Sequence, residues 1–557
     1  MEARRFDLND YPVVIGLDFG TTYSGCAYAF TQDGDVVDIV KWPRQMNSVY
    51  PKTPTLNFYK RDSQVMLWWG NAAKLEMMKP QNRDAILLKQ YKLALDESQA
   101  VGPFPNGLTV LDAISHYLKA FHDHVISELK KGFAKNYNQS QFRYCLTVPA
   151  MWSDRAKAQT REAAIRAGLI SREDHRDRLM LISEPEAAAL YCEKKCEQFN
   201  LKHGDRFMIC DAGGGTVDLI VFQIDDTPNG RRLRECTKGH GRSCGSVFID
   251  RRMRALLKKR LRNYQLDETR KNALEATMDS FVDLVKPHFD GTEDQFLQLP
   301  AALNLGEINN ESIGLEGGML RLSAQELKTE VFDPVIQEVL GLIEDQLHKA
   351  GHLQAIFLVG GFGNSSYLFE RTKQQFRDRV PLIATPPRAE MAVVRGAVLF
   401  GLNPRIVTTR IPRYWYGIDT TTTFEEGVDP WEYRIVRADG TVRCDNRFSV
   451  FARRGVPINT DTYVSKSFFA YYPHHTTITL YAADCEDQPR YVTSPGVRKV
   501  ANFSVPMPVL QGVREGDKVD LTIKIWFGEV ELKVEAEIRG KTYSTTCIFD
   551  SELAQTN

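Results

Sequence analysis

Two glycine-rich turns in the sequence combine aspartate, glycine and threonine in the same order. Residues 18–23 read Asp-Phe-Gly-Thr-Thr-Tyr, and residues 211–218 read Asp-Ala-Gly-Gly-Gly-Thr-Val-Asp. Glycine lets the bare backbone come within hydrogen-bond distance of a bulky anion, and threonine hydroxyls add neutral donors. The aspartate that opens each turn supplies a hard oxygen ligand for Mg²⁺ or its waters. Two such turns facing each other would hold the phosphates and metal ion of a nucleotide from both sides.

Two further segments place a special residue at the end of an apolar run. Residues 181–189 predict a short strand and then a helix with Pro185 in its first turn, where the missing N–H costs little. Glu184 is then presented at a strand end, although a plain helix cap is the alternative interpretation of this segment alone. Residues 356–365 predict a buried strand that ends in a glycine turn, which can lie flat against a ring or sugar.

Apolar periodicity predicts the elements that must position these turns. Residues 13–17, 25–30 and 36–41 predict three strands in a meander, with the first turn between the first two. Apolar side chains spaced by three or four predict a helix from residue 111 to about residue 132. Residues 87–93 form a basic, helix-like stretch within an inserted lobe.

The remainder of the first 404 residues continues to alternate strands and helices. Residues 144–148 predict a strand, and residues 154–167 predict a helix capped by Ser153. Ser323 fits a capping box at the start of a long helix that ends at Gly351. The basic residues 251–262 have a helical pattern, for which a solvated amphipathic face is favoured over a nucleic-acid patch.

Beyond Pro404 the helical pattern gives way to alternation of apolar and polar residues. This alternation runs through residues 519–525 and 530–538, with Gly528 between the two runs. The pattern predicts a meander of hairpins in an antiparallel sandwich.

Composition sets broad limits on the class of protein. A length of 557 residues suggests two to four domains, and 43% hydrophobic with 25% charged residues is typical of a soluble globular chain. Lys+Arg and Asp+Glu each total 71, so nothing argues for a nucleic-acid or membrane partner. No apolar run approaches the roughly 18 residues of a membrane helix. Ten cysteines without a C-x-x-C pair predict reduced thiols in a cytoplasmic protein.

Taken together, these segments resemble the 70-kilodalton heat-shock chaperones and their actin and sugar-kinase relatives. Besides the two turns, the resemblance rests on Val-Pro-Ala at residues 148–150, Glu-Pro-Glu-Ala-Ala-Ala at 184–189 and Val-Gly-Gly at 359–361. It covers roughly residues 13–403. It implies an α/β protein with an actin-like, ribonuclease H-like duplicated ATPase fold and inserted lobes, followed by an antiparallel β-sandwich domain.

The resemblance also implies a domain organisation. Few residues follow the last predicted strand, so the helical lid of the family is not expected, and the chain looks most like the divergent subfamily named heat shock 70 kDa protein 12-like. The expected parts are a tail (1–12), a nucleotide-binding domain (13–404, lobe I about 13–190 and lobe II about 205–404), a linker (405–412), a β-sandwich domain resembling a chaperone substrate-binding domain (413–550) and a second tail (551–557).

Binding roles follow from the resemblance residue by residue. Asp18 and Asp211 would hold Mg²⁺ through its waters. The residues implied to contact ATP or ADP are Gly20, Thr21, Thr22, Tyr23, Gly213, Gly214, Gly215, Thr216, Lys286, Gly360, Gly361 and Phe362.

Catalytic roles follow in the same way. Lys92 would neutralise charge at the γ-phosphate, with Lys89 as the alternative because the flanking residues do not fix the register. Glu184, Thr216 and Asp218 would position the attacking water. Phosphoryl transfer has a loose transition state, so positioning, the metal ion and a cation supply most of the catalysis. No strong general base is required, and slow turnover is expected of a nucleotide switch.

The adenine-binding part departs from the family pattern. Pro287 stands where the family has an arginine that stacks on adenine, and Asn364 also replaces an arginine. We therefore expect phosphate binding to be better preserved than adenine selectivity, and ATP binding to be weaker or differently shaped than in a typical chaperone.

The sequence thus predicts a chaperone-like, Mg-ATP-binding protein of the stress-response type with slow ATP hydrolysis. Its nucleotide state would be coupled, weakly because the family's leucine-rich linker is missing, to a β-rich domain that binds an unfolded peptide or protein. Co-chaperones or a nucleotide exchange factor are further expected partners. The alternative is a nucleotide-binding scaffold or adaptor with negligible ATPase activity. A carbohydrate or metabolite kinase is less favoured, because no segment indicates a base aspartate aimed at an acceptor.

Overall fold

The computed structural model gives the structure of most of the chain. Residues 1–10 of the predicted N-terminal tail (1–12), the predicted tail at 551–557 and the predicted turn at Gly528 lie outside the described residues. The described residues are 11–45, 50–82, 84–96, 99, 104–133, 137–195, 198–228, 230–264, 268–437, 440–505, 507–527, 530–544 and 546–549.

The first main sheet includes the strands on either side of the first glycine turn. Its central strand runs antiparallel to the strand that leaves the turn and parallel to the strand of residues 142–148. The predicted meander and the strand at 144–148 are confirmed. In order across the sheet, the strands are β3 (Val37–Ile39), β2 (Tyr23–Phe30), β1 (Val13–Asp18), β8 (Phe142–Val148) and β9 (Leu179–Ser183), with β4 (Thr53–Pro54) paired to β2.

The second sheet repeats this arrangement around the second glycine turn. Strand β10 (Arg206–Ala212) runs antiparallel to β11 (Val217–Thr227) and parallel to β17 (Ala355–Val359), as β1 does to β2 and β8. The other strands of this sheet are β12 (Gly230–Glu235), β13 (His240–Arg242), β18 (Leu382–Ala384), β19 (Val407–Arg410) and β23 (Ile458–Asn459).

Two helices pack between the sheets and hold them together. Helices α4 (Glu184–Glu193) and α11 (Ala392–Leu402) share one apolar core with residues of both sheets. Gly396 brings α11 so close to α4 that a side-chain carbon there would lie 1.7 Å from the carbonyl oxygen of Ala187. Gly16 has the same function in β1, where such a carbon would lie 2.7 Å from the carbonyl oxygen of Val394. Glycine therefore sets the spacing of the sheets.

Further helices and small sheets cover the outside of the two main sheets. Helices α2 and α3 pack on the outer face of the first sheet, where the apolar residues of α2 join the core predicted from their spacing. The remaining helices before residue 404 are α1 (Gly70–Met77), α2 (Val110–Gly132), α3 (Asp154–Arg166), α5 (Val247–Arg260), α6 (Glu268–Ser280), α7 (Ala324–Glu326), α8 (Asp333–Ala350), α9 (Gly360–Gly363) and α10 (Ser366–Phe376), with π-helical turns at Phe281–Val285 and Leu327–Phe332.

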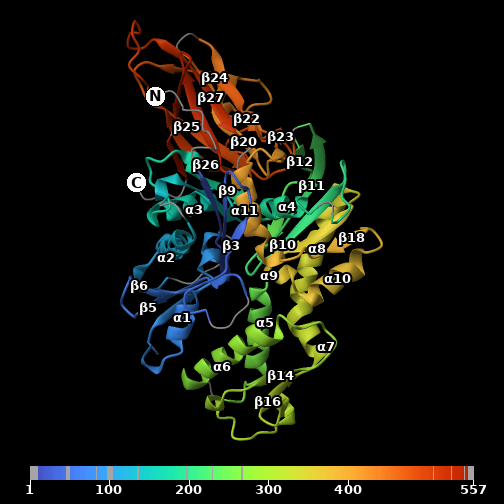
Figure 1. The fold of residues 1–557 in the computed structure, drawn as a ribbon. Coiled ribbons are helices and arrows are strands. Elements are labelled where there is room, and N and C mark those ends of the chain that lie inside the picture. Colours follow the sequence, from blue (N-terminus) through green and yellow to red (C-terminus); the bar gives the residue numbers. More distant parts are fainter. Residues whose placement is uncertain are drawn as a thin grey trace.

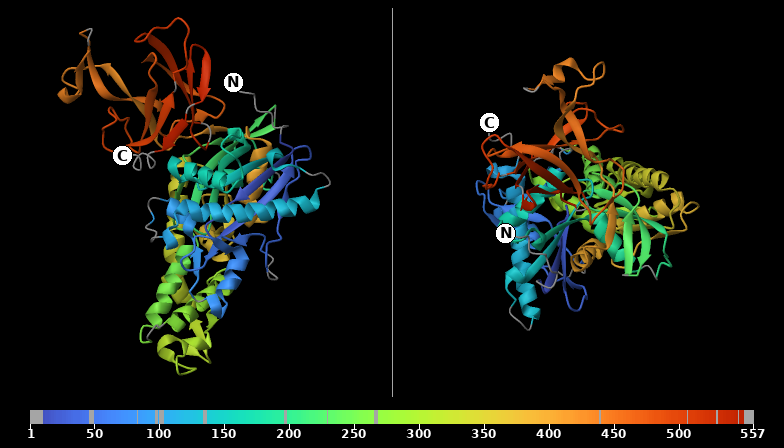
Figure 2. Two further views of the ribbon diagram at one scale, coloured as in Figure 1. Left: turned by 90° about the vertical axis from the view of Figure 1, so that its left-hand side faces the viewer. Right: turned by 90° about the horizontal axis from the view of Figure 1, so that it is seen from above.

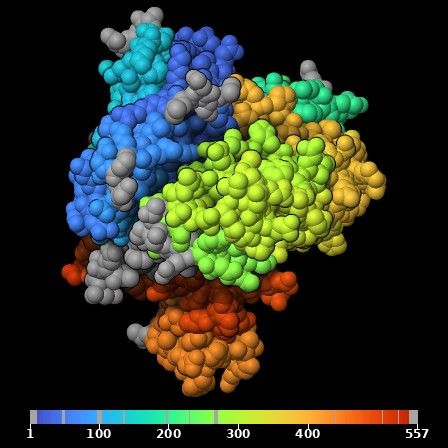
Figure 3. All heavy atoms as spheres, turned by 90° about the horizontal axis from the view of Figure 1, so that it is seen from below, coloured from blue at the N-terminus to red at the C-terminus, as the bar shows by residue number. Residues whose placement is uncertain are grey.

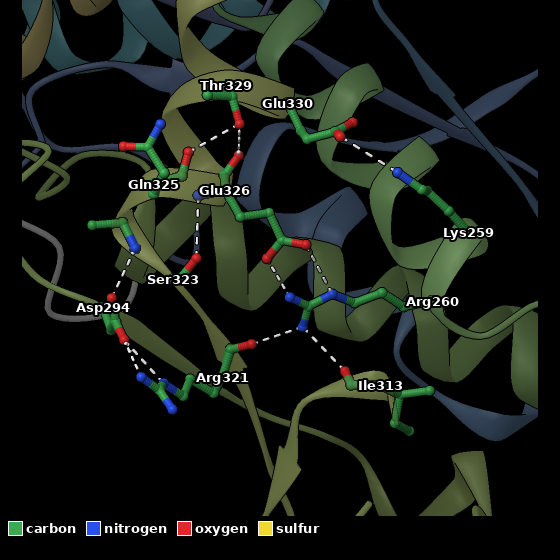
Figure 4. A network of polar contacts seen from close by, with 11 residues as sticks. Lys259, Arg260, Asp294, Ile313, Arg321, Ser323, Gln325, Glu326, Thr329 and Glu330 are labelled. Carbon is green, nitrogen blue, oxygen red and sulfur yellow. Dashed lines mark hydrogen bonds and ion pairs between the residues drawn. The ribbon is translucent and has the colours of Figure 1, made fainter. Parts of the chain in front are cut away.

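Helix α5 confirms the helical prediction for the basic stretch. Figure 4 shows the polar contacts of two of its basic residues, Lys259 and Arg260. The Arg260 guanidinium forms an ion pair with Glu326 and donates to the carbonyl oxygens of Ile313 and Arg321, at 3.1 and 2.7 Å. The predicted Ser323 cap is also confirmed, because its hydroxyl accepts from the Glu326 N–H at 3.2 Å. This network joins α5 to the small sheet of β14 (Gln295–Gln298), β15 (Leu315–Glu316) and β16 (Met319–Leu322).

The helix-like interpretation of residues 87–93 is wrong. The segment contains β7 (Ile86–Lys89), which pairs with β5 (Leu56–Tyr59) in a small sheet that also includes β6 (Met66–Trp69). Gln90 follows at a φ of 58°, which ends the strand, and a 3₁₀ helix occupies Tyr91–Leu95. Pairing with β5, a contact distant in sequence, overrides the local helical spacing.

After residue 404 the described residues form strands and the 3₁₀ turn Trp431–Tyr433. Apart from β19 and β23, which belong to the second main sheet, these strands build two antiparallel sheets that bury one shared apolar core. Strand β27 (Lys518–Trp526) has the predicted alternation of buried and more exposed residues. The first sheet holds β20 (Trp415–Thr423), β21 (Arg434–Val436), β22 (Val442–Ala452), β25 (Thr476–Ala483), β26 (Val497–Val505) and β30 (Thr546–Phe549); the second holds β24 (Val464–Tyr471), β27 (Lys518–Trp526), β28 (Lys533–Ile538) and β29 (Lys541–Ser544).

This C-terminal β-region lies against α3 and the edge of the second sheet (Figures 1 and 2). The Tyr416 hydroxyl donates to Asp154 of α3 at 2.9 Å, and Arg161 forms an ion pair with Glu531 at 2.6 Å. Strand β19, within the predicted linker 405–412, pairs in parallel with β12 and antiparallel with β23 of the β-region. The chain between the two parts is therefore tied to both of them.

The half-buried carboxyl group of Glu235 lies next to the end of β19. The Ile411 N–H donates to Glu235 at 3.3 Å, and Arg410 forms an ion pair with Glu186 at 2.5 Å. Burial, helped by the Glu186 carboxylate, raises the pKa of Glu235 to about 7, although Arg410 opposes the shift.

No helix in the described part of the chain has the length and apolar character needed to cross a bilayer.

We expect Glu235→Gln to stabilise the protein at pH 7.5 but not at pH 5. The ordinary pKa of 4.5 is raised in the folded state, so the folded protein binds more protons and the wild type loses stability as pH rises from about 4.5 to 7. Glutamine keeps the acceptor without the titration, which is worth roughly 1–3 kcal/mol at the higher pH. Melting temperatures at both pH values check this. Glu344→Gln, in which Arg379 lowers the pKa of the carboxyl, is the control and should give no such gain.

Candidate functional site

The two glycine turns face each other across the junction of the two main sheets. A side-chain carbon at Gly214 would lie 2.3 Å from the Thr22 hydroxyl oxygen, and one at Gly215 would lie 2.4 Å from the Thr21 hydroxyl oxygen. Both distances are too short for a carbon and an oxygen atom that are not bonded, so only glycine at these two positions lets the turns come this close to each other. The structure thus brings together the predicted residues of both turns.

Neighbouring segments fix the backbone of each turn. The carbonyl oxygens of Gly213 and Gly214 accept from the N–H groups of Ser246 and Val247 at the start of α5, at 3.1 and 2.9 Å. In the first turn, the Thr22 carbonyl oxygen accepts from the Thr55 N–H at 2.8 Å, and the Thr55 hydroxyl donates to the Gly20 carbonyl oxygen at 2.8 Å. The carbonyl oxygens are therefore occupied from outside the junction, a geometry suited to a turn whose other side receives an anion.

Four buried carboxyl groups surround the turns: Asp18, Glu184, Asp211 and Asp218. Asp211 and Asp218 lie opposite each other in the pairing of β10 with β11. Burial raises the pKa of Asp211 well above its ordinary value, and the charges of the other three carboxylates raise it further. Burial also raises the pKa of Glu184 to about 7, against the opposing charge of Lys92. These mutual effects show that the predicted acidic residues share one site.

Lys92, and not Lys89, lies in this site. Its ammonium group is 2.7 Å from Glu184 Oε1, and only 3% of its side chain is exposed. The ammonium also lies over the ring of Trp152, at 5.1 Å from its centroid. Lys89, at the end of β7, is exposed. The geometry therefore favours Lys92 for the position that the sequence left open.

A second lysine, Lys52, was missed by the sequence analysis. Its ammonium group lies 2.6 Å from Asp18 Oδ2. Burial opposes the charged form, but the neighbouring Asp18 and Tyr50 raise the pKa of Lys52 above its ordinary value. Lys52 precedes β4 in a stretch with no periodic pattern, and no sequence signal marked it. Only the pairing of β4 with β2 brings it to Asp18.

Among the described residues, one carboxylate oxygen of Asp218 accepts a hydrogen bond and the other does not. Its Oδ1 accepts from the Met151 N–H at 2.9 Å, whereas Oδ2 has no hydrogen-bond partner among the described residues. The residue is fully buried. A buried acceptor without a partner is costly unless water or a ligand satisfies it, which suits a residue that orients a water.

The donor set fits hydrated Mg²⁺. The four carboxylates outnumber the two ammonium groups of Lys52 and Lys92, so the site favours an added cation. In the described part of the chain, no three His, Cys, Asp or Glu side chains are gathered closely enough to hold a metal ion alone. Mg²⁺ usually keeps several waters and takes one or two carboxylates together with phosphate oxygens. Asp18 and Asp211, one from each sheet, can supply those carboxylates.

The third glycine turn closes against the same carboxylates. Gly360 has a φ of 84°, and a side-chain carbon there would lie 2.6 Å from Asp211 Oδ1. At Gly361 such a carbon would lie 3.3 Å from the Tyr50 hydroxyl oxygen, and the Tyr50 ring is 4.9 Å from that of Tyr23. Phe362 is buried in the apolar core of the second half. Of the three residues of this turn predicted to contact nucleotide, Phe362 can therefore offer only its backbone.

Lys286, predicted to contact the nucleotide, and the two residues that depart from the family's adenine-binding pattern are paired with neighbours or exposed. Lys286 forms an ion pair with Asp250 of α5 at 2.8 Å. Pro287 is exposed, and Asn364, also exposed, donates to Glu390 at 3.2 Å. Figure 3 shows the blue lobe that carries α1 beside the yellow-green lobe, and the ion pair of Lys74 with Asp283 at 2.9 Å joins the two lobes.

Comparison with known proteins gives the family. The family model described as "Hsp70 protein" matches residues 119–401, which include Glu184, the second turn and the third turn. The chain belongs to the Hsp70 family. This result confirms the predicted family.

Full-length similarity places the chain near a divergent branch of Hsp70. It is 27% identical to human heat shock 70 kDa protein 12B, over 96% of this chain and 90% of that protein. It is 25% identical to mouse heat shock 70 kDa protein 12A, over 94% and 89%. Similarity to chaperone protein DnaK of Psychrobacter cryohalolentis is 24%, over 73% and 62%. The predicted resemblance to the 12-like subfamily of Hsp70 is thus confirmed.

We expect Gly214→Ala and Gly215→Ala to destabilise the protein by about 1–3 kcal/mol, because the added methyl groups overlap Thr22 and Thr21 and force the turns apart. Melting temperatures of the nucleotide-free variants check this. Gly341→Ala is the matched control, since no atom of the described residues lies within 4 Å of a carbon added there in α8, and it should stabilise by up to about 1 kcal/mol. Equal effects at all three positions would contradict contact between the turns.

Proposed function

We propose that this protein binds Mg-ATP between the two glycine turns and hydrolyses it slowly as a chaperone-like member of the Hsp70 family. The observation that carries the proposal is the approach of Gly214 and Gly215 to Thr22 and Thr21, with buried carboxylates around the junction. Membership of the Hsp70 family supports ATP and ADP as the nucleotides.

We infer that the two main sheets are the halves of an actin-like, ribonuclease H-like duplicated ATPase fold spanning residues 13–404. The repeated strand pattern around β1 and β10 supports this inference, as does the glycine turn at the same place in each half. The inferred C-terminal domain, residues 413–550, is a β-sandwich, supported by its two antiparallel sheets and shared core.

In this proposal the binding residues act by position and charge. Asp18 and Asp211 would hold Mg²⁺ through waters, and the bound ion would offset negative charge on the β- and γ-phosphates. Thr21, Thr22 and the amides of residues 213–216 would donate to phosphate oxygens, whose approach requires the bare glycine backbone.

The catalytic residues would act on the attacking water and on the developing charge. Lys92, held by Glu184 at 2.7 Å, would place a cation at the γ-phosphate. Glu184 and Asp218 would orient the water, and Asp218 Oδ2, which has no hydrogen-bond partner within the described ranges, is one acceptor available for it. Thr216 would help to position it. Since phosphoryl transfer depends chiefly on such positioning, no strong base is required.

The proposal includes weak adenine selectivity. Pro287 has no planar cation to stack on a base, and the exposed Asn364 is engaged with Glu390. Tyr50, next to Gly361, and Tyr23, whose ring lies 4.9 Å from that of Tyr50, offer aromatic surface beside the third turn. This arrangement also favours the second candidate function, a nucleotide-binding scaffold with negligible turnover.

We propose further that the β-region binds an unfolded peptide or protein partner and that nucleotide state reaches it through β19. Support for this path comes from the pairing of β19 with both β12 and β23 and from the Arg161–Glu531 ion pair. The path differs from the weak coupling expected from the missing leucine-rich linker. Co-chaperones or an exchange factor remain proposed partners by family membership.

Calorimetry and single-turnover ATPase assays test the proposal together. Wild type should bind Mg-ATP at or below millimolar nucleotide and hydrolyse it at least about tenfold faster than Asp211→Ala or Glu184→Gln, because each variant removes a carboxyl group that would hold the metal ion or orient the water. Glu344→Gln, which removes an exposed carboxylate paired with Arg379, should match wild type.

The outcomes separate the two candidate functions. If Mg-ATP binds but wild type and the two site variants hydrolyse it at the same rate, the ATPase proposal is rejected and the nucleotide-binding scaffold is retained. Absence of binding at millimolar Mg-ATP would overturn both.

A further inference from the structure

Lys52 places a fixed positive charge on one of the two predicted metal-binding carboxylates. Its ammonium group lies 2.6 Å from Asp18 Oδ2, and the two side chains are 8% and 7% exposed. The other oxygen, Asp18 Oδ1, accepts from the Thr147 hydroxyl at 3.1 Å. Both oxygens of Asp18 are therefore engaged by the chain itself.

The backbone around Lys52 holds it at this position. Lys52 directly precedes β4, whose residues Thr53 and Pro54 pair with Ser24 and Tyr23 of β2. Thr55 then binds the first turn through its N–H and hydroxyl. Lys52 is thus anchored to the same turn that carries the predicted phosphate contacts, and its stem starts from a paired and buried segment.

The absence of a side chain at Gly25 leaves room for the aliphatic part of Lys52 to reach Asp18. Gly25 is the residue opposite Asp18 in the pairing of β1 with β2, and the Lys52 side chain packs against it. A side-chain carbon at Gly25 would come within 3.0 Å of Lys52 Cγ and 3.2 Å of Cε. A side chain at that position would crowd the stem, so the close packing of Lys52 on β2 depends on glycine there.

Lys52 and Lys92 divide the acidic site between them. Lys92 pairs with Glu184, the predicted water-positioning residue, and Lys52 pairs with Asp18, a predicted metal-binding residue. Lys52 therefore holds the charge that a divalent ion would otherwise provide to Asp18. Two cations cannot both approach the same carboxylate oxygen closely without strong repulsion.

We propose that Lys52 is a tethered cation that competes with divalent metal ions for Asp18, so that the nucleotide-free site binds Mg²⁺ weakly. The inference rests on the proposed function for the identity of the metal-binding residues. Bound phosphates would add the negative charge that lets the lysine and a metal ion share the site. The chemistry is that of a small divalent cation with oxygen ligands.

Titration of the nucleotide-free protein with Mn²⁺ alone, followed by electron paramagnetic resonance of the free ion, tests the proposal. Lys52→Met should bind one Mn²⁺ at least about tenfold more tightly than wild type, since the carboxylate loses its competing charge. Lys52→Arg keeps the charge and should bind as weakly as wild type. Adding Asp18→Asn to Lys52→Met should abolish the gain.

A matched control and a second readout guard against loss of folding. Lys524→Met removes a lysine paired with Glu537 at 2.5 Å in the β-region, and it should not change Mn²⁺ affinity. In melting experiments, millimolar Mg²⁺ should raise the melting temperature of Lys52→Met relative to chelator, with a much smaller effect on wild type. If Lys52 only stabilises the fold, Lys52→Met will melt lower with no recovery in Mg²⁺.

These outcomes are distinguishable from failure of the proposed function. Equal Mn²⁺ affinity of wild type and Lys52→Met, with no recovery of melting temperature in Mg²⁺, overturns the inference even if Mg-ATP binds. Tighter Mn²⁺ binding by Lys52→Met supports it even if calorimetry shows no nucleotide binding, because neither measurement uses nucleotide.

Discussion

The burial of four carboxyl groups where the two main sheets meet is the constraint on which the rest of the structure depends. Charged groups that leave water must be paired or hydrogen-bonded, or they bind protons instead. Lys52 and Lys92 pair two of the carboxylates, and the Met151 N–H satisfies one oxygen of Asp218. Burial raises the pKa values of Glu184 and Asp211, and the neighbouring carboxylates raise them further. The fold therefore keeps more buried carboxyl groups than ammonium groups at the point where its glycine turns meet, so positive charge is lacking there.

Local patterns predicted the parts of this arrangement that depend on near neighbours in sequence. The strands that end at Asp18 and Asp211 show their apolar runs directly, and the Ser323 cap needs only a residue three positions away. The glycine turns could be predicted because glycine seldom stands where a residue with a side chain would serve equally well. A cluster of glycines therefore marks a backbone that needs the absence of side chains. Even the juxtaposition of the two turns followed, but from the family resemblance and not from either turn alone.

Contacts distant in sequence explain what could not be predicted. Lys52 reaches Asp18 only because β4 pairs with β2, and the choice of Lys92 over Lys89 is made by Glu184, 92 residues further along the chain. The stretch around Leu88 has helical spacing but pairs with β5 as a strand. The phenyl ring of Phe362 turns into the core behind its glycine turn, which sequence position alone does not disclose.

Strand β19 gives the molecule a mechanical property. The order β11, β12, β19, β23 is continuous in one sheet, so the β-region contributes a strand to the same sheet that carries Asp218. A rotation of the β-region as a rigid body would have to break or bend these strand pairs and cannot proceed as free swinging about a flexible joint. A load applied to the β-region is thus transmitted through two neighbouring strands to the strand at the base of the acidic site, and strain at that site is transmitted back by the same path.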